Sequence, residues 1–439
     1  MTYNDARAYL DTLPRWAVQG SAAYRPGLAT MELLMDGLGR PHEAFPSVHI
    51  GGTNGKGSTA SLLAAVASAG GRRVGLHTSP HLVDFAERMR LGGQPAPHAW
   101  IADAVARHRS LFDDVQPSFF EATVALAFLF FAEMEVDLAV VEVGLGGRLD
   151  ATNVLTPEAA LVTYVGLDHT DVLGATKAAI ARAKAGIAKP GVPFLTAERD
   201  PAVRAVLQAE AEARGASFEA VRATVTVDVH PGHEGTTRLD VTTPVRRYAD
   251  LAVGLPGMHQ AWNAALALRA AERAFGGARL VEEAARQGIT EVRKLAGIRG
   301  RCEIWSESPL TVLDVSHNAD GLAAALAFVQ AQRRARIALA PLVVLLGLMR
   351  DKDLDALVPL LRHAEATVLP VSLDSARARS ASDLRSALAS AGLALSPADA
   401  PTAPAAALAW LRRPTAPHAA VLAAGSHLVV ADLLRAAGA

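Results

Sequence analysis

Cysteine is almost missing from this sequence, since Cys302 is the only one among 439 residues. One thiol can form neither an internal disulfide nor a cysteine-ligated zinc site, and so low a content is typical of a reducing compartment. Long apolar runs are missing too, because segments such as Ala122–Ala132 stop short of the roughly 18 residues that span a bilayer. Met1–Pro14 lacks the basic start and apolar centre of a signal peptide. We therefore expect a cytoplasmic protein with no membrane partner.

An excess of charge is absent as well. The 43 Lys+Arg and 44 Asp+Glu residues give a formal net charge of -1, so no basic field is available to attract nucleic acid. Aromatic residues make up 5% and hydrophobic residues 51%, and alanine is abundant, which indicates closely packed helices and excludes disorder. Lysine is scarce, with six among the 43 basic residues, so a lysine that persists is a candidate for chemistry that needs an amine.

The length predicts two domains, because single cores stop growing near roughly 250 to 300 residues. The first two-thirds alternates short apolar runs with longer alanine- and leucine-rich segments, the pattern of a mostly parallel sheet with crossover helices. The predicted strands are 48–50, 74–78, 138–143 and 160–165, and the predicted helices are 57–68, 121–134, 177–188, 201–214 and 260–274. Between about Ser217 and Val253, Val/Thr alternation broken by Gly and Pro predicts an antiparallel patch at the edge of the domain.

A domain boundary is predicted at Gly297–Arg301, where a helical pattern ends in glycine-punctuated sequence. New strands are predicted beyond it, at 310–315, 342–346, 366–371 and 419–423. The expected fold class is α/β, with a mostly parallel-sheet domain over residues 1–296 and a smaller Rossmann-like α/β domain over residues 297–439. Ligands in such sheets bind outside the carboxyl ends of the strands.

Glycines gather between a predicted strand and a predicted helix, in Gly51–Ser58. Glycine lets backbone N–H groups wrap phosphate oxygens, the helix N-terminus adds a favourable dipole, and Lys56 can reach the outer phosphates. The spacing departs from the common G-x-x-x-x-G-K-[ST] form, and the alternative is a plain glycine-rich turn. The context favours a P-loop ATPase domain whose phosphate-binding residues are Gly52, Thr53, Asn54, Gly55, Lys56, Gly57 and Ser58.

Polar side chains follow two further strands. Glu142 ends a predicted buried strand, the place where nucleotide-hydrolysing folds hold Mg²⁺, although an acid satisfied by hydrogen bonds is an equal alternative. His169 follows the next strand, and Lys184 lies fifteen residues later on a predicted helix. A lone histidine is more often a satisfied loop or core residue than a ligand. Here His169 is expected at the same sheet edge as the phosphate loop and Glu142, which favours a functional role.

Together these residues resemble the Mur ligase superfamily, and most closely the folylpolyglutamate synthase and dihydrofolate synthase family in its bifunctional bacterial form. The matching blocks run in the family's order across nearly the whole chain: Gly52–Ser58, Thr78–Leu82, Glu87–Arg90, Phe120–Thr123, Glu142–Asn153, Asp168–His169, Lys184–Ile187, Pro256–Gln260 with Asn263, Gly300–Arg301, Asp314–Asn318 and Gly425–Ser426. Many short matches in one order are more specific than any single loop.

The resemblance implies an ATP-dependent carboxylate–amine ligase. ATP would phosphorylate a substrate carboxylate, and the amino group of L-glutamate would attack the acyl phosphate. The implied catalytic residues are Lys56, His169 and Lys184, and the implied magnesium ligands are Ser79, Glu142 and His169. Asn263 is expected by the adenine, and the second domain is expected to bind ATP through Arg301, Asp314 and His317, whose alternatives are ordinary linker and strand-end polar groups.

In this family the lysine matching Lys184 is commonly carbamylated by CO₂, a reaction closed to arginine because its guanidinium stays protonated. Two departures weaken local positioning arguments. The residue before the lysine is Ala183 where the family often has glutamate, and the familiar Asp-Gly-Ala-His-Asn block reads Asp-Val-Ser-His-Asn from Asp314.

The resemblance also implies small-molecule substrates (dihydropteroate or a reduced folate, L-glutamate and ATP) and a monomer. Phe120 could stack on a flat pterin and Asp150 could bind its amino-pyrimidine edge, which favours a bifunctional enzyme. The alternatives are a core phenylalanine and an aspartate that caps a turn. Competing functions are another Mur-type amino-acid ligase of cell-wall precursor synthesis, and a nucleotide-binding switch that ligates nothing.

Overall fold

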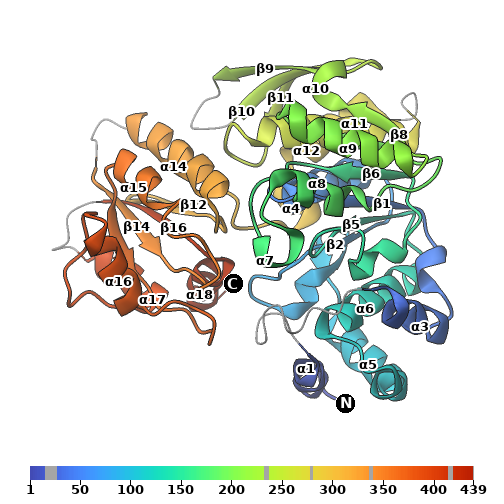
Figure 1. The fold of residues 1–439 in the computed structure, drawn as a ribbon, viewed down its shortest axis with the longest axis horizontal. Coiled ribbons are helices and arrows are strands. Elements are labelled where there is room, and N and C mark those ends of the chain that lie inside the picture. Colours follow the sequence, from blue (N-terminus) through green and yellow to red (C-terminus); the bar gives the residue numbers. More distant parts are fainter. Residues whose placement is uncertain (15–26, 232–236, 277–279, 336–339, 414–418, 439) are drawn as a thin grey trace. The chain divides into compact units, whose positions relative to one another are not determined.

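The computed structural model describes residues 1–14, 27–231, 237–276, 280–335, 340–413 and 419–438. The chain divides into two compact units (Figure 1). The first comprises Met1–His230, Arg238–Gly254 and Gln260–Ile298, and the second comprises Pro231–Thr237, Leu255–His259 and Arg299–Ala439. The second unit therefore includes two short segments, Pro231–Thr237 and Leu255–His259, that precede its main part in the sequence.

An eight-stranded sheet forms the centre of the first unit, in the order β4-β3-β2-β5-β1-β6-β7-β8. Pairing is parallel from β2 to β8, whereas β3 and β4 are antiparallel additions at one edge. The strands are β1 (Ser47–Gly51), β2 (Val74–His77), β3 (Met89–Leu91), β4 (Gln94–Pro95), β5 (Leu138–Glu142), β6 (Ala159–Val162), β7 (Pro193–Thr196) and β8 (Ser217–Ala220). The predicted mostly parallel α/β sheet is confirmed.

Helices cover both faces of this sheet. Val141 of β5 and Val162 of β6 lie on the same face, because they are in register with His49 and Gly51 of β1. This face packs against the phenylalanine-rich α6 in one half of the sheet and against α8 and α9 in the other half. The opposite face is covered by α4 and α11. The helices and helical turns of this unit are α1 (Tyr3–Thr12), α3 (Ala29–Gly37), η2 (Pro41–Glu43), α4 (Lys56–Ala69), η3 (Phe85–Arg88), α5 (His98–Val115), α6 (Phe119–Glu133), η4 (Ala151–Val154), α7 (Thr170–Leu173), α8 (Lys177–Ala185), α9 (Pro201–Ala213), α10 (Val221–Thr224), α11 (Gln260–Phe275), α12 (Glu282–Thr290) and α13 (Val292–Ala296).

A second, three-stranded sheet in the order β11-β10-β9 occupies the region of the predicted antiparallel patch. Its strands are β9 (Thr226–Pro231), β10 (Thr237–Thr242) and β11 (Arg247–Val253). The four-residue connection from β10 to β11 requires these two strands to be antiparallel. The prediction was wrong for Ser217–Ala220, because this segment extends the main sheet in parallel with β7, where Phe218 stacks on Phe194 with ring centroids 6.3 Å apart.

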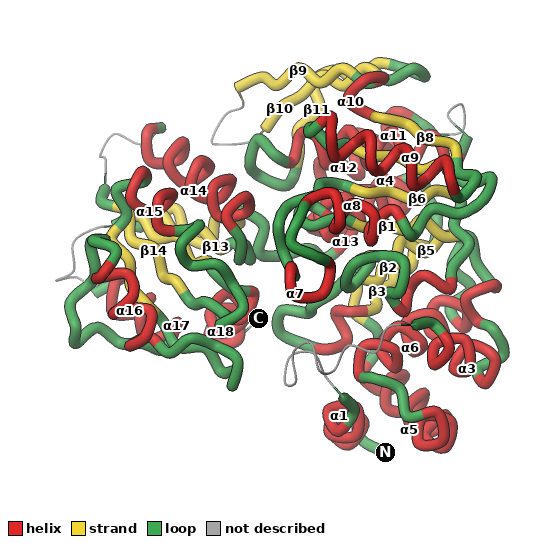
Figure 2. The backbone as a smooth tube through the Cα atoms, viewed as in Figure 1, coloured by secondary structure: helices red, strands yellow, loops and turns green. Residues whose placement is uncertain are grey.

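The second unit contains a five-stranded sheet in the order β12-β13-β16-β14-β15, with β12 as an antiparallel edge strand. Figure 2 shows strands of this sheet in yellow, β13 and β14 among them. Pairing of β13, β16, β14 and β15 is parallel. The elements are β12 (Glu303–Glu307), β13 (Leu310–Leu313), α14 (Ala319–Arg334), β14 (Leu342–Leu346), α15 (Val358–His363), β15 (Thr367–Pro370), α16 (Ala381–Ser390), α17 (Pro404–Leu411), β16 (Ala420–Ala424) and α18 (His427–Ala436). Across the part of the chain that the structure describes, no helix combines the length and the apolar character needed to cross a membrane.

Candidate functional site

The predicted phosphate loop connects the central strand β1 to the buried helix α4. Gly52 and Gly55 have φ angles of 142° and 88°, a region of backbone conformation that favours glycine. A Cβ atom at Gly55 would lie 2.7 Å from Oδ1 of Asn263, and one at Gly52 would overlap the side chain of Thr163. Both glycines are therefore required by the curvature and the close packing of this loop.

Side chains from the β6 end hold the loop in place. The hydroxyl of Thr163 donates to the carbonyl of Asn54 at 2.7 Å, and the amide of Thr53 donates to the carbonyl of Tyr164 at 2.6 Å. The ammonium of Lys56 donates to the carbonyl of Thr53 at 3.1 Å, so this side chain folds back over the loop. Sequence reasoning missed Thr163, because nothing near it in the chain signals a partner more than a hundred residues away.

The first turn of α11 lies against the same loop. Gln260 is fully buried, and its amide nitrogen lies 3.4 Å from the hydroxyl of Ser58. The side-chain amide of Asn263 donates to the side-chain carbonyl of Gln260 at 2.8 Å. The structure thus brings Asn263 next to the phosphate loop.

Glu142 and Ser79 lie together at the carboxyl edge of the sheet. Glu142 is the last residue of β5 and is buried, and its Oε2 accepts a hydrogen bond of 3.1 Å from the amide of Ser79. Ser79 follows β2, the strand next to β5. His169 follows β6, two strands away from β5, and has a left-handed backbone with φ 51°. Its Nε2 lies 4.0 Å from the carboxylate of Asp168.

Lys184 is the buried cation of this region. It lies in the last turn of α8, and its ammonium donates to the carbonyl of Gly52 at 2.8 Å, so it contacts the phosphate loop directly. Burial, with a smaller contribution from the charge of Lys56, lowers the pKa of Lys184 to about 7, against the opposing effects of Asp168 and Asp150. An amine with this pKa is largely neutral at mildly alkaline pH, whereas an ordinary lysine is charged.

Asp150 closes the loop that follows Glu142. One carboxylate oxygen accepts from the amide of Leu145 at 2.7 Å, and the other accepts from both the amide and the hydroxyl of Thr152. Asp150 is the N-cap of η4 and is buried, and this burial raises the pKa of its carboxyl against the effect of the hydrogen bonds. The carboxylate therefore caps a turn, as in the alternative interpretation of the sequence.

Phe120 lies in the first turn of α6, beside this loop. A capping box, in which Ser118 and Glu121 exchange hydrogen bonds with each other's backbone amides, fixes the start of the helix. The ring of Phe120 occupies the space above Gly144, where a Cβ atom would overlap it. Its side chain is half-buried, in contrast to the fully buried phenylalanines further along α6, so Phe120 keeps a surface that a flat ligand could contact.

Three predicted residues belong to the second unit. The carboxylate of Asp314 accepts hydrogen bonds of 2.8 Å from the amides of Cys302 and Ser316 at the end of β13. His317 lies next to this turn, and its Nδ1 is 3.1 Å from the carbonyl of Val315. Arg301 and Asp314 both act on the charge of His259, whose pKa is lowered mainly by burial. This unit therefore gathers Arg301, Asp314 and His259 in one place.

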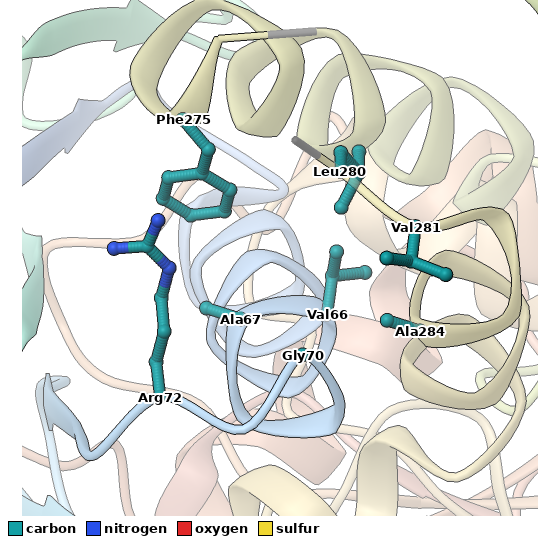
Figure 3. Close-up of a pocket in the computed structure, with 8 residues that line it drawn as sticks. All are labelled: Val66, Ala67, Gly70, Arg72, Phe275, Leu280, Val281 and Ala284. Atoms are coloured by element: carbon teal, nitrogen blue, oxygen red, sulfur yellow. The ribbon is translucent and has the colours of Figure 1, made fainter. Parts of the chain in front are cut away.

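A small pocket with mostly apolar lining residues lies at the other end of α4 from the phosphate loop (Figure 3). Its one charged group is the guanidinium of Arg72, which lies 4.4 Å from the centroid of the Phe275 ring. The lining residues are Val66, Ala67, Gly70, Arg72, Phe275, Leu280, Val281 and Ala284. None of them is a predicted site residue, so the pocket is separate from the proposed chemistry.

Few protein ligands are available for a metal. Within the described ranges, no group of three or more His, Cys, Asp or Glu side chains is arranged to hold a metal ion. Of the predicted ligands Ser79, Glu142 and His169, only Glu142 and His169 are of these residue types, and Glu142 supplies the only carboxylate of the set. This donor set fits Mg²⁺, which typically binds one or two carboxylates and completes its shell with substrate phosphates and water.

Comparison with known proteins agrees with this arrangement. Residues 50–271 match the Mur ligase middle domain, and residues 300–427 match the Mur ligase glutamate ligase domain. Dihydrofolate synthase/folylpolyglutamate synthase of Bacillus subtilis is 34% identical over 391 residues, which cover 87% of this chain and 88% of that protein.

Solved structures of two relatives extend the similarity. An FPGS-AMPPCP-folate complex has a TM-score of 0.80 at 29% identity, with 100% of this chain and 100% of that chain covered. Escherichia coli FolC in complex with DHPP and ADP has a TM-score of 0.85 at 28% identity, with 100% of this chain and 98% of that chain covered. These similarities confirm the predicted folate-type ligase and favour it over the two alternatives, a ligase of cell-wall precursor synthesis and a nucleotide-binding switch. The chain belongs to the dihydrofolate synthase/folylpolyglutamate synthase family of the Mur ligases, enzymes that use ATP to join glutamate by an amide bond.

Proposed function

We propose that this enzyme is bifunctional and adds L-glutamate both to dihydropteroate and to the glutamate of reduced folates. The observation that carries this proposal is the similarity, over 87% of the chain, to a B. subtilis protein named for both activities. The half-buried ring of Phe120 above Gly144 supports it, because an aromatic face beside the carboxyl edge of the sheet can stack on a pterin.

Steady-state assays of the purified protein test this proposal. Glutamate-dependent ATP turnover is measured with MgATP and either dihydropteroate or tetrahydrofolate, and both substrates are expected to support it. An enzyme that uses tetrahydrofolate and never accepts dihydropteroate would be a folylpolyglutamate synthase alone. Turnover that needs a folate but no glutamate would contradict the ligase reaction itself.

The reaction proceeds in two displacements. A carboxylate oxygen of the folate substrate attacks the γ-phosphorus and ADP leaves, and then the amine of glutamate attacks the acyl carbon, loses a proton and displaces phosphate. We propose that the backbone of Gly52–Ser58 and the ammonium of Lys56 hold the phosphates, and that Asn263 lies by the adenine. In the second unit, the proposed ATP contacts are Arg301, Asp314 and His317.

We propose that Glu142, with Ser79 and His169, holds Mg²⁺, which would neutralise phosphate charge when it is bound. Ser79 lies against the Glu142 carboxylate, and His169 follows a strand of the same parallel sheet. We propose catalytic roles for Lys56, His169 and Lys184. Lys56 lies in the phosphate loop, Lys184 donates to the carbonyl of Gly52 in that loop, and His169 follows β6 at the same edge of the sheet.

Glu142→Gln is expected to raise the Mg²⁺ concentration for half-maximal activity by roughly tenfold or more and to slow turnover, because a neutral amide is a poorer ligand for a hard cation. The measurement is a Mg²⁺ titration at saturating ATP. Glu198→Gln is a matched control, since Glu198 is fully buried and accepts hydrogen bonds from the amides of Val165 and Asp200. An unchanged Mg²⁺ requirement in Glu142→Gln would contradict direct binding of the metal.

Asp150→Ala separates the two roles of Asp150. A pterin contact predicts a selective loss with dihydropteroate, of roughly tenfold to over a hundredfold in kcat/KM for one charge-assisted hydrogen bond. The capping geometry predicts similar losses with both substrates. We expect the second result, because both carboxylate oxygens already accept hydrogen bonds from the chain. A selective loss with dihydropteroate would restore the pterin contact.

A further inference from the structure

A buried hydrogen-bonded chain connects β1 to the loop after Glu142. Nε2 of His49 lies 2.8 Å from the hydroxyl oxygen of Thr152, and this hydroxyl in turn contacts the carboxylate of Asp150. His49 and Thr152 are fully buried and lie 103 residues apart in the sequence. His49 lies outside the matching blocks named above, and the proposed reaction gives it no role.

The direction of the hydrogen bonds follows from counting protons. Asp150 accepts backbone amides on both carboxylate oxygens, which is the pattern expected of an ionised carboxylate. The single hydroxyl proton of Thr152 is therefore donated to Asp150, and the same oxygen accepts a hydrogen bond from His49. His49 must carry its proton on Nε2, and the pKa of this histidine is lowered to about 3 by burial and by the nearby Lys189 and His77, so the ring is neutral.

This chain fixes the shape of the segment beside Phe120. The carboxylate that Thr152 orients also holds the amide of Leu145 at 2.7 Å. Leu145 directly follows Gly144, the residue above which the Phe120 ring lies. A shift of the Asp150 carboxylate would therefore move Gly144 and change the surface that Phe120 presents.

We propose that His49 is a positioning residue for the folate substrate, acting through Thr152 and Asp150 on the Gly144–Asp150 loop. The proposal rests on the proposed function, because it takes Phe120 to lie at the folate site. His49 touches no substrate in this scheme. Its effect is expected on the KM for the pteridine substrate and not on the KM for ATP, since the phosphate loop has its own hydrogen bonds to Thr163 and Tyr164.

Two substitutions break the chain at different points. His49→Leu removes the N–H donor, and Thr152→Val removes the hydroxyl while keeping the shape of the side chain. Each is expected to raise the KM for tetrahydrofolate about tenfold, the effect of leaving one buried hydrogen-bonding group without its partner. The KM for ATP should stay unchanged. His49→Gln, which can place an amide N–H near the position of Nε2, should restore most of the binding.

A double-mutant cycle is the decisive measurement. If His49 acts only through Thr152, the double variant should be no worse than the more impaired single variant, because residues of one network are not additive. Thr196→Val is a matched control, since the buried hydroxyl of Thr196 donates to the carbonyl of Val162 and accepts from the amide of Glu198. It should lower the melting temperature and leave the KM for tetrahydrofolate unchanged.

Additive losses, an unchanged KM for tetrahydrofolate, or a parallel rise in both KM values would overturn the positioning role. If His49→Leu does not fold, the same hydrogen-bonded chain is tested by comparing Thr152→Val with Thr152→Ser, which keeps the hydroxyl. Failure of the proposed bifunctionality can be told apart from failure of the positioning role of His49, because the test uses tetrahydrofolate. A wild-type enzyme that rejects dihydropteroate can still give the predicted result in the double-mutant cycle.

Discussion

Lys56→Ala is expected to lower kcat for glutamate addition by roughly two or more orders of magnitude, the usual effect of removing a well-placed electrostatic stabiliser. Lys56 is the first residue of α4, and its ammonium already folds over the phosphate loop onto the carbonyl of Thr53. Charge that develops on the transferring phosphoryl group would therefore meet this cation directly. The measurement is kcat at saturating ATP, folate and glutamate.

Two further variants give this experiment its controls. Lys294→Ala removes the same charge from a side chain that is 80% exposed, and it should leave kcat near the wild-type value. Lys56→Arg keeps the charge but replaces the compact ammonium that folds onto the carbonyl of Thr53 with a planar guanidinium, so a large loss is expected here too. Near-wild-type glutamate addition by Lys56→Ala would refute the role of Lys56, provided that the protein is folded.

Lys184→Ala is expected to be the second severe variant, because we propose that Lys184 carries a carbamate in the active enzyme. The neutral amine attacks the carbon of CO₂, an N–C bond forms and the nitrogen releases a proton, which leaves an anionic group. A pKa of about 7 makes the neutral amine available near physiological pH, and the charge of Lys56 close by would stabilise the new anion.

The sign of the pH dependence follows from this pKa. At a fixed concentration of dissolved CO₂, the rate of reactivation of a CO₂-depleted enzyme should rise with pH through about 7, where half of Lys184 is neutral, and level off roughly one pH unit above it, where the neutral fraction saturates. Labelling with ¹³CO₂ and NMR would detect the carbamate directly. Lys184→Ala should lose roughly a hundredfold in kcat, with partial rescue by a small added carboxylate, and Lys184→Arg should not be rescued. Full activity without CO₂ would disprove the carbamate.

The core of the fold was predictable because its signals are local. β1, the glycine loop and α4 follow one another in the chain, and a buried β-branched run before a glycine loop and an alanine-rich helix determines each of them. Edge strands carry weaker signals. β8 has no fully buried residue, and β12 is an antiparallel strand with partly exposed side chains, so neither stands out as a buried run.

Helix ends and side-chain partners depended on packing across the chain. α8 ends at Ala185, earlier than the predicted Ala188, with Gly186 as its C-cap, and at Gly186 the chain packs so closely on Arg148 that a Cβ atom would overlap it. The residues that approach the phosphate loop were predictable from their blocks, but their contacts were not. The hydrogen bond of Lys184 to Gly52 joins residues 132 positions apart, and no pattern near either residue indicates it.

The path of the chain between the two units limits how the gene can be divided. A fragment that ends at Ile298 keeps Leu255–His259, which belongs to the second unit, but lacks Arg301 and Asp314, the charged residues that act on His259. A fragment that begins at Arg299 has those residues without His259. Neither product of a single cut is a whole unit. Separate expression of the second unit would therefore need both earlier segments, Pro231–Thr237 and Leu255–His259, supplied by fusion.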